Sequence, residues 1–244
     1  MRLAPLLLCL CLPLRADGLA DLRTALRNLR GGGPVKATLE YDVWRRTTED
    51  KKPVVSQGKA TAQVEDGPQG LRITWSRSLL QQAVEESAAQ VQQPDRPAPT
   101  RTALRGVDAV DLAEGLDHAG ALLRDLDQAQ LLAEKDEPWQ GRPAHLLILK
   151  LSPRIPESQR KYLKELKVDA RVWVGADALP LAYTSAVSFQ GSRFFIHFEG
   201  ASSQERQFAR VGGRLVAVRT TREEQSTGLG MSSQSRKVTV LTLL

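Results

Sequence analysis

The residue types that usually carry out catalysis are present in this chain, but their spacing does not assemble them. The three histidines, His118, His145 and His197, lie on separate segments without the HxH or HxxxH spacing of a metal site, and we expect them at the surface or at sheet edges. No serine lies in a GxSxG or SxxK context, and no glycine-rich stretch joins a strand to a helix as a phosphate loop does. Adjacent carboxylates such as Glu85 and Glu86 face different directions. The sequence therefore predicts no catalytic residue, no metal site, no cofactor and no enzymatic activity.

The aromatic and aliphatic side chains indicate a different chemistry, the binding of hydrocarbon. Side chains alternate between the two faces of a strand, so apolar residues at every second position line one surface. The candidates for lining a lipid cavity are Leu39, Tyr41, Ile73, Trp75, Leu181, Tyr183, Phe189, Phe194 and Phe198. A core filled by the protein's own helices is the alternative. These two interpretations overlap, because a sheet that binds lipid is a hydrophobic core in which one part remains open to a ligand.

Two groups of cations could meet the polar end of such a ligand. Arg45 follows the inward series of the first predicted strand, which places it at the rim beside a lipid headgroup or helix carbonyls; a plain exposed arginine is the alternative. The segment 153–167 is predicted to be a basic helical insertion that could lie on an anionic membrane surface, or else form a solvated cover over the sheet edge. Its membrane-surface candidates are Arg160, Lys161, Lys164 and Lys167.

The stretch from Val168 to Ser202 is expected to form the strands that position most of these side chains. It contains three alternating apolar segments separated by predicted turns at Gly175–Ala178 and Gln190–Ser192, a pattern typical of an antiparallel meander. Two further strands are predicted over 128–137 and 143–151. Because the second of these is apolar on both faces, we expect it to be covered on both sides.

The remaining segments supply helices and more strands. Helical spacing predicts helices over 19–30, over 79–93 with Ser78 as a candidate cap, and over 117–126. Alternation predicts strands over 35–48, 58–64, 71–75, 205–211, 215–222 and 237–243. We expect residues 94–100 to form an extended connector, and a long polar loop to contain Gly228 and Gly230.

The N-terminus and the charge indicate where the protein works. A charged start, an apolar run from Leu3 to Leu14 and small residues at Ala16 and Gly18 predict a cleaved signal peptide over 1–18 and export to the periplasm. Both cysteines lie in that segment, so the mature domain, 19–244, must rely on its core rather than on disulfides. The net charge is +6, but basic and acidic residues alternate without a basic stripe carrying stacking aromatics, so we expect no nucleic-acid partner.

The order of these elements resembles the periplasmic lipoprotein-localisation factors, LolA and LolB. The resemblance is carried by Gln140-Gly141-Arg142-Pro143-Ala144 before an apolar strand, and by Val172-Trp173-Val174 followed by Asp177 and Leu179-Pro180-Leu181. It implies an α+β fold, an unclosed and strongly curved antiparallel half-barrel whose concave apolar face is covered by amphipathic helices and holds acyl chains. The connector at 94–100 and the basic insertion depart from that pattern.

The resemblance implies two functions. The first is an exported periplasmic carrier or chaperone related to outer-membrane lipoprotein sorting, whose partners are acyl chains of a lipid or lipoprotein. A membrane surface, or an inner- or outer-membrane protein, would be a transient partner. The alternative is a non-enzymatic periplasmic module for protein interaction or envelope-stress sensing, with the same fold.

Overall fold

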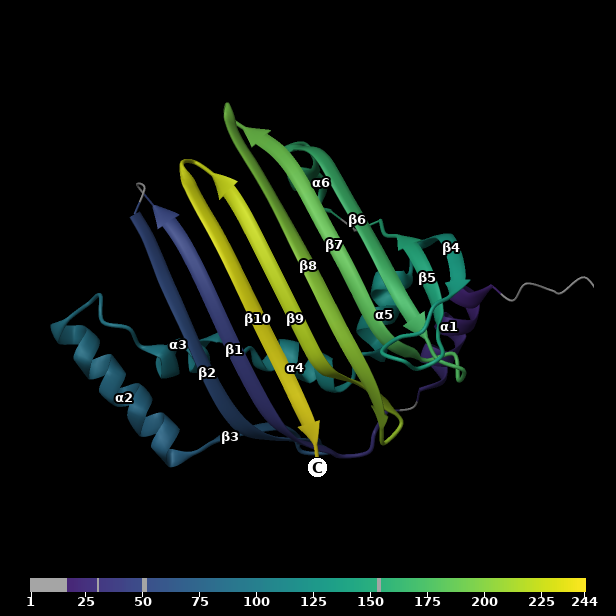
Figure 1. Cartoon of the computed structure of the whole chain (residues 1–244), viewed down its shortest axis with the longest axis horizontal. Coiled ribbons are helices and arrows are strands. Elements are labelled where there is room, and N and C mark those ends of the chain that lie inside the picture. The colour runs from purple at the N-terminus through teal and green to yellow at the C-terminus, as the bar shows by residue number, and fades with distance from the viewer. Residues whose placement is uncertain (1–16, 30, 50–51, 153–154) are drawn as a thin grey trace, which may run out of the picture.

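The computed structural model describes residues 17–29, 31–49, 52–152 and 155–244. Within these residues, ten strands form one antiparallel sheet in the order β3-β2-β1-β10-β9-β8-β7-β6-β5-β4 (Figure 1). The strands are β1 (Val35–Glu49), β2 (Lys52–Gly67), β3 (Gly70–Trp75), β4 (Gln130–Asp136), β5 (His145–Lys150), β6 (Leu163–Val174), β7 (Pro180–Arg193), β8 (Ile196–Val211), β9 (Arg214–Gly228) and β10 (Met231–Leu243). Strand β10 returns to pair with β1 in the middle of the sheet. The sheet is unclosed because the edge strands β3 and β4 do not pair with each other.

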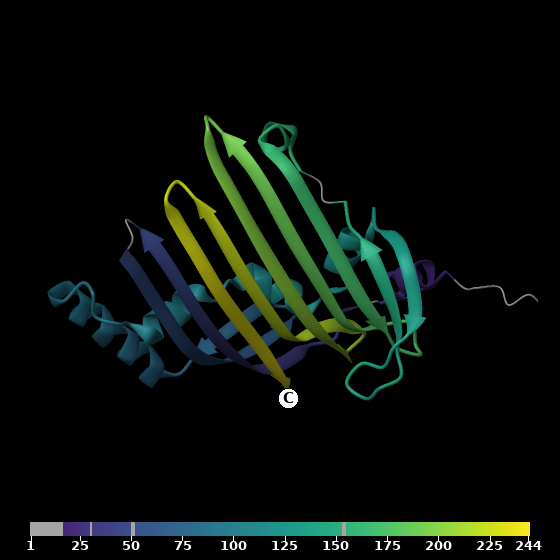
Figure 2. The same ribbon diagram turned by 45° about the horizontal axis from the view of Figure 1, so that its top comes forward.

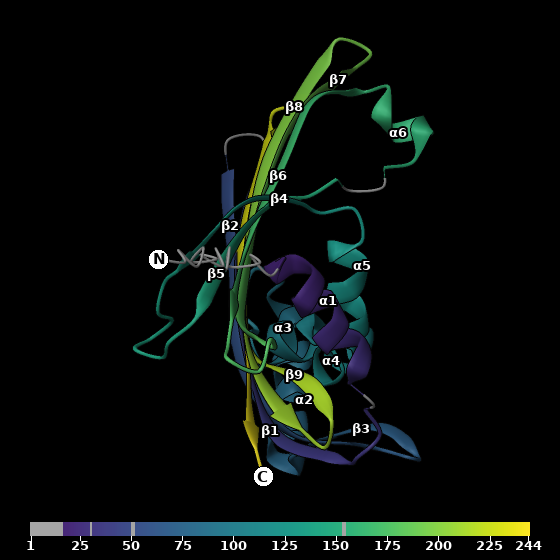
Figure 3. The ribbon, with the colours of Figure 1, turned by 90° about the vertical axis from the view of Figure 1, so that its right-hand side faces the viewer.

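Helices lie on one face of this sheet, which we call the inner face (Figure 3). In the described residues they are α1 (Gly18–Asn28), α2 (Arg77–Gln92), α3 (Pro99–Gly106), α4 (Ala109–Leu116), α5 (Ala119–Leu126) and α6 (Glu157–Arg160). The predicted α+β class, an unclosed antiparallel sheet with helices on its apolar face, is therefore confirmed. The turned view in Figure 2 shows part of this helical layer behind the strands, with α2 standing beyond the β2 side of the sheet.

Helices α1 and α5 build the main core. Asp17 caps α1 by accepting hydrogen bonds from the backbone N–H groups of Leu19 and Ala20, at 3.1 and 3.3 Å. The fully buried Leu22 and Leu126 belong to one cluster with inner-face residues of β5 to β9. Asp17 and Gly18, which we predicted to be the end of the signal peptide, thus take part in the first helix; residues 1–16 lie outside the described part of the chain.

Two smaller clusters hold α3 and α4 on the same inner face, toward the edge of the sheet that β3 forms. Leu112 and Leu116 of α4 pack on the alternating inner residues of β1, β2 and β9. Helix α3 lies directly on β2 because Gly58 has no side chain: a Cβ there would collide with the carbonyl oxygen of Pro99. The helix starts at Pro99, so the predicted extended connector over 94–100 is wrong at its end, where proline occupies the first turn of a helix.

The outer face is covered in one place. The loop after β4 brings Trp139 to Trp173 of β6, with ring centroids 4.5 Å apart, and Leu146 and Ala182 lie beneath them. Because Leu147 and Leu149 face the inner cluster, β5 is buried on both faces, as the sequence predicted.

Several predicted turns and loops are strands. The chain stays extended through Gln190–Ser192, and the β7–β8 turn falls at Phe194 and Phe195, both with positive φ, 50° and 67°. The predicted polar loop forms the ends of β9 and β10, joined by a tight turn at Leu229 and Gly230.

Two helix predictions need correction. The predicted helix near 153–167 is wrong, because only Glu157–Arg160 is helical and β6 begins at Leu163. Ser76, not Ser78, caps α2, where its hydroxyl accepts a hydrogen bond from the N–H of Leu79 at 3.2 Å.

The long strands continue past the main helices, which divides the sheet into two halves. Strand β3 pairs only with Ala62–Gly67 of β2, and β5 only with Asp169–Val174 of β6. We define the open half as Leu163–Val168, Val187–Ser202, Glu224–Ser235, Arg45–Glu49 and Lys52–Ser56, and the remainder as the covered half. Figure 3 shows helices α1 to α5 beside the covered half only, with the short α6 alone standing out from the open half.

Candidate functional site

On the inner face of the open half, the residues of β6 to β8 are mainly apolar and those of β9, β10 and β1 are mainly polar. On β6 and β7, Leu166 pairs with Phe189 and Val168 with Val187, and alternation places all of these on the inner face with the buried Tyr183. Along the same rows, the positions on β9, β10 and β1 hold polar residues, among them Ser226, Ser233, Ser235 and Arg45. The apolar strip therefore runs along β6 to β8.

Two phenylalanines form the floor of that strip. Phe189 stands opposite Gly200 and Phe198 opposite Gly191, and each ring lies over the glycine of the neighbouring strand, where a Cβ would collide with it. Their ring centroids are 6.4 Å apart at an interplanar angle of 52°. Rings that cover cross-strand glycines give a flat hydrocarbon surface on an otherwise single-layered sheet.

A cavity of about 640 Å³, which we call the tip cavity, lies at the end of this strip. Its lining includes Arg45, Phe189, Phe194, Phe198 and Met231. The structure thus brings together four of the sequence candidates, three phenylalanines and the rim arginine, although Phe194 lies in the turn and not on a strand face.

A second cavity, the mouth cavity, has a volume of about 750 Å³ and lies where α1 and α5 meet the open half. Leu123, Val168, Tyr183 and Val187 contribute its apolar walls. Burial raises the pKa of the Tyr183 hydroxyl to about 12, so this group stays a neutral donor at the cavity wall.

Charged groups surround the rim of the mouth cavity. Arg23 and Arg27 of α1 and Arg124 and Asp125 of α5 are part of its lining. Arg23 donates a hydrogen bond to the carbonyl oxygen of Leu126, which holds α1 to the end of α5. Burial raises the pKa of the Asp125 carboxyl, with Arg206 opposing, although the Asp125 side chain still reaches solvent at the rim.

The other lipid-cavity candidates lie apart from these two cavities. Leu39 and Tyr41 line a smaller cavity of about 120 Å³ beneath α4. Ile73 and Trp75 are part of β3 and pack against the covered core. Leu181 is half-buried next to the turn at Gly175, so the predicted concave set divides between the core and the open half.

The four membrane-surface candidates do not share a helix face. Arg160 ends α6, and Lys161 holds its Nζ 5.1 Å from the ring centre of Tyr162. Lys164 and Lys167 lie in β6, where Lys167 pairs with Glu165 at 2.6 Å. Their role at a membrane stays a prediction.

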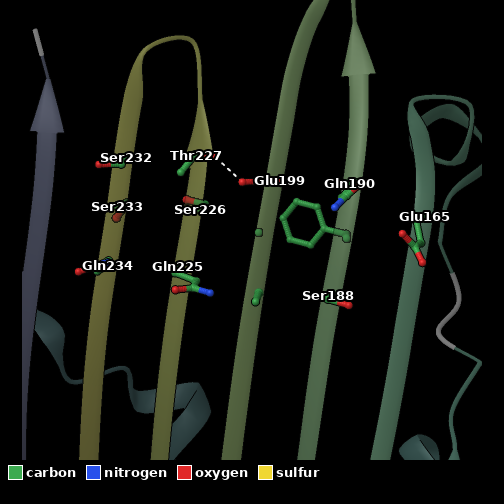
Figure 4. Close-up of a pocket in the computed structure, with 13 residues that line it drawn as sticks. Glu165, Ser188, Gln190, Glu199, Gln225, Ser226, Thr227, Ser232, Ser233 and Gln234 are labelled. Carbon is green, nitrogen blue, oxygen red and sulfur yellow. Dashed lines mark hydrogen bonds between the residues drawn. The ribbon is translucent and has the colours of Figure 1, made fainter.

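The outer face of the open half has a different character. A hollow of about 370 Å³ there is lined mainly by short hydroxyl and amide side chains, and Figure 4 shows them on β6 to β10. Thr227 Oγ1 donates to Glu199 Oε1 at 3.3 Å across this surface. Such a surface suits water rather than hydrocarbon.

The histidines differ from the sequence expectation in one case. His118 is 1% exposed and stacks on Phe208 with centroids 5.5 Å apart, so its prediction as a surface or edge residue is wrong. His145 lies at the edge, between Asp136 at 3.0 Å and Glu134 at 3.2 Å, and the hydrogen bond to Asp136 is the main cause of its raised pKa.

Sequence reasoning missed Leu229, Met231 and Arg193 at the tip of the open half. Arg193 lies 5.0 Å from the ring centre of Tyr162 and 5.2 Å from that of Phe194, and Leu229 and Met231 line the tip cavity. The signal that could have found them is Gly230, the second residue of a two-residue hairpin turn that directly follows Gly228.

The described residues were also compared with the requirements for a membrane-spanning helix and for a metal site. None of the helices there has the length and hydropathy of a membrane span. The same residues contain no group of three or more His, Cys, Asp or Glu side chains placed to hold a metal ion.

Comparisons with known proteins leave the family open. No protein-family model matches the chain, and no curated protein matches it. Among solved structures, the chain is similar to MucB in its crystal structure with MucA(peri), at 12% sequence identity over 92% of this chain and 93% of that chain, with a TM-score of 0.20. This likeness is too low to carry an argument, so the resemblance to the lipoprotein-localisation factors stays a prediction from the sequence.

Proposed function

We propose that this protein is a non-enzymatic, exported binding protein that holds an acyl chain on the inner face of its open half. The observation that carries the proposal is the apolar track along β7. Its inner residues Tyr183 and Val187 line the mouth cavity and Phe189 lines the tip cavity, so the two cavities adjoin along one strand. A linear hydrocarbon suits a track of this shape.

The energetics favour such a ligand. Each methylene removed from water contributes on the order of 0.8 kcal/mol, so about a dozen methylenes offset the several kcal/mol that binding costs in ordering. The exposed apolar side chains at the tip, Phe194 at 76% and Met231 at 48%, gain contacts only when something covers them. The cations at the rim of the mouth cavity, Arg23 and Arg27, would meet the polar end of the chain.

The experiment is a titration with a fluorescent fatty-acyl probe, using adjacent residues of β7 as a matched pair. Val187 faces the track and Ala186 faces the outer surface. We expect saturable binding by the wild type and by Ala186→Asp, and at least tenfold weaker binding by Val187→Asp, because a carboxylate on the track must be desolvated by the chain.

Circular dichroism of both variants separates a binding defect from an unfolded sheet. A folded wild type that takes up no probe would contradict the proposal. So would equal binding by the two folded variants.

A carrier and an interaction module differ in what occupies the track. The carrier is favoured by the two cavities, which helices α1 to α6 of the described residues leave unfilled. Protein recovered from the periplasm and extracted with organic solvent should release lipid if the function is that of a carrier; a bound peptide instead would favour the interaction module.

A further inference from the structure

A third cavity, of about 120 Å³, lies at the centre of the inner face between α4 and the strands β1, β8, β9 and β10. We call it the central cavity. Its volume corresponds to roughly four water molecules. A small polar group fits there, whereas an acyl chain does not.

The sheet side of the central cavity is basic. Arg222 of β9 stands directly opposite Lys237 of β10, and Arg206 lies on the next inner position of β8. Like charges directly opposite each other destabilise a sheet unless an anion offsets them. Arg222 has Glu224 at 2.5 Å, but within the described residues Lys237 forms no ion pair.

The helix side of the same cavity is acidic. Asp108, Asp111 and Glu114 of α4 line it. Asp108 is used as the helix cap, and Glu114 pairs with Arg124 at 2.8 Å. In the described part of the chain, Asp111 makes no ion pair, so one cation and one anion face the cavity from opposite walls.

Two buried polar groups in the cavity wall also lack partners. The Tyr41 hydroxyl and both ring nitrogens of His118 form no hydrogen bond of good geometry with the described residues, although Tyr41 is only 6% and His118 only 1% exposed. The Glu114 backbone is near the His118 ring, but the contact does not meet the geometry of a hydrogen bond. A neutral imidazole and a phenol each offer a donor, and buried donors without an acceptor are rare. These donors lie on the same cavity as the basic strands.

The central cavity adjoins the mouth cavity. Tyr183 and Ser185 line the mouth cavity, and their cross-strand partners on β8, Arg206 and Gln204, line the central cavity. With the Gln204 amide oxygen turned toward Arg206, it accepts hydrogen bonds from Nε at 3.0 Å and Nη2 at 2.8 Å, which fixes the guanidinium at this boundary. A ligand could therefore keep its chain in one cavity and its head in the other.

We propose that the central cavity binds a zwitterionic phosphoamine, the phosphoethanolamine headgroup of a lipid whose chain occupies the mouth cavity. The phosphate meets Lys237, Arg222 and the donors of Tyr41 and His118, and the ammonium meets Asp111. A purely anionic headgroup would leave Asp111 facing a like charge. This inference rests on the proposed acyl-chain function and names the class of lipid.

The test is calorimetric titration with three soluble probes: dihexanoyl phosphatidylethanolamine, dihexanoyl phosphatidylglycerol and free phosphoethanolamine. We expect the wild type to bind the ethanolamine lipid at least tenfold more tightly than the glycerol lipid. Lys237→Met should weaken binding of both lipids at least tenfold. The matched control Arg236→Met, the adjacent residue on the outer face of β10, should change neither.

Asp111→Asn separates the two charges of the headgroup. It should remove the preference for the ethanolamine lipid while leaving the affinity for the glycerol lipid the same or higher. Circular dichroism confirms that each variant is folded.

The outcomes distinguish the two proposals. Equal affinity for both lipids, unchanged by Lys237→Met, would overturn the headgroup site even if the fatty-acyl probe still binds. Binding of free phosphoethanolamine as tightly as the lipid would assign the cavity to the soluble molecule and overturn its role as a headgroup site. Loss of all lipid and acyl-probe binding by a folded wild type would instead overturn the acyl-chain function.

Discussion

The covered and open halves of this sheet are built from the same strands, yet their inner faces do different things. In the covered half, Leu22, Leu122 and Leu126 fill the space above the strands and are fully buried. In the open half, Phe189 and Phe198 lie over glycines and no helix from α1 to α5 covers them. A strand can therefore be part of a closed core at one end and present a hydrocarbon surface at the other.

The outer face of the open half differs from its inner face in polarity. Beyond the cluster around Trp173, the outer residues of β6 to β10 in the open half are mainly polar, as at Ser188 and Ser232. A layer of sheet that is polar on one face and apolar on the other needs a cover on the apolar face only. We infer that the ligand is that cover.

The largest expected effect is in the covered half, at the buried ion pair between Arg214 and Asp66, whose side chains are 10% and 18% exposed. Asp66→Asn leaves the Arg214 charge buried without its partner, and should lower the free energy of unfolding by about 4 kcal/mol. Urea denaturation measures this. The neighbouring Glu65, paired with Lys36 at the surface, is the matched control, and a loss for Glu65→Gln as large as that for Asp66→Asn would contradict the assignment.

Leu126→Ala should cost about 3 kcal/mol of unfolding free energy, because it removes a fully buried side chain from the cluster that α1 and α5 share. Leu80→Ala on α2, where Leu80 is 46% exposed, should stay within about 0.5 kcal/mol. Similar losses from both variants would mean that α1 and α5 are not the fixed cover of this half.

The covered half should also be sensitive to acid. Burial, together with the nearby Arg206 and Arg124, lowers the pKa of His118 from 6.5 to about 3, and the Glu114 carbonyl opposes this only in part. Between these two values the unfolded chain binds a proton that the folded chain does not, so stability falls with falling pH by about 1.4 kcal/mol per unit. At pH 5 the accumulated loss is about 2 kcal/mol.

Denaturation at pH 7 and pH 5 tests this, with His118→Phe, which keeps a ring on Phe208 and removes the titration. Because His145 has the opposite shift, the informative quantity is the difference between wild type and variant. A His118→Phe protein with an unchanged pH dependence would rule out the buried neutral histidine.

The smallest effect on stability is expected in the open half. Phe198→Ala removes a half-buried ring from a surface without a second layer, and should cost about 1 kcal/mol. The same substitution should weaken acyl-probe binding severalfold, because the ring forms part of the tip cavity. A stability loss as large as that of Leu126→Ala would mean that the open half is an ordinary core.

Alternation and helical spacing were enough to predict α1, β1, β3 and the doubly buried β5. These patterns gave wrong predictions where the residue types are unusual for the element that they form. The turn at Phe194 and Phe195 carries positive φ on two aromatic residues, where asparagine or glycine is the usual signal. Residues 223–236 are polar on both faces, and they become strands because each side has a neighbour to pair with.

The candidate site could be predicted in part. Phe189, Phe198 and Arg45 were identified because each continues an inward series, and they do line one cavity. The central cavity could not be found in this way, since Tyr41, His118 and Lys237 come from distant segments and meet only when β10 pairs with β1. The spacing of Tyr162, Leu163 and Leu166 fits a helix as well as a bulged strand, and the sheet decides for the strand.

The most direct test of the difference between the halves is photo-crosslinking with a fatty acid that carries a diazirine near its methyl end, followed by peptide mapping. We predict labelling confined to the open half, at Leu163–Val168, Val187–Ser202 and the tip-cavity residues Arg45–Thr48 and Thr227–Ser233, with competition by unlabelled fatty acid. Labelling of the buried leucines of α1 and α5, or labelling spread over both faces of the sheet without competition, would contradict the claim that the open half holds the chain.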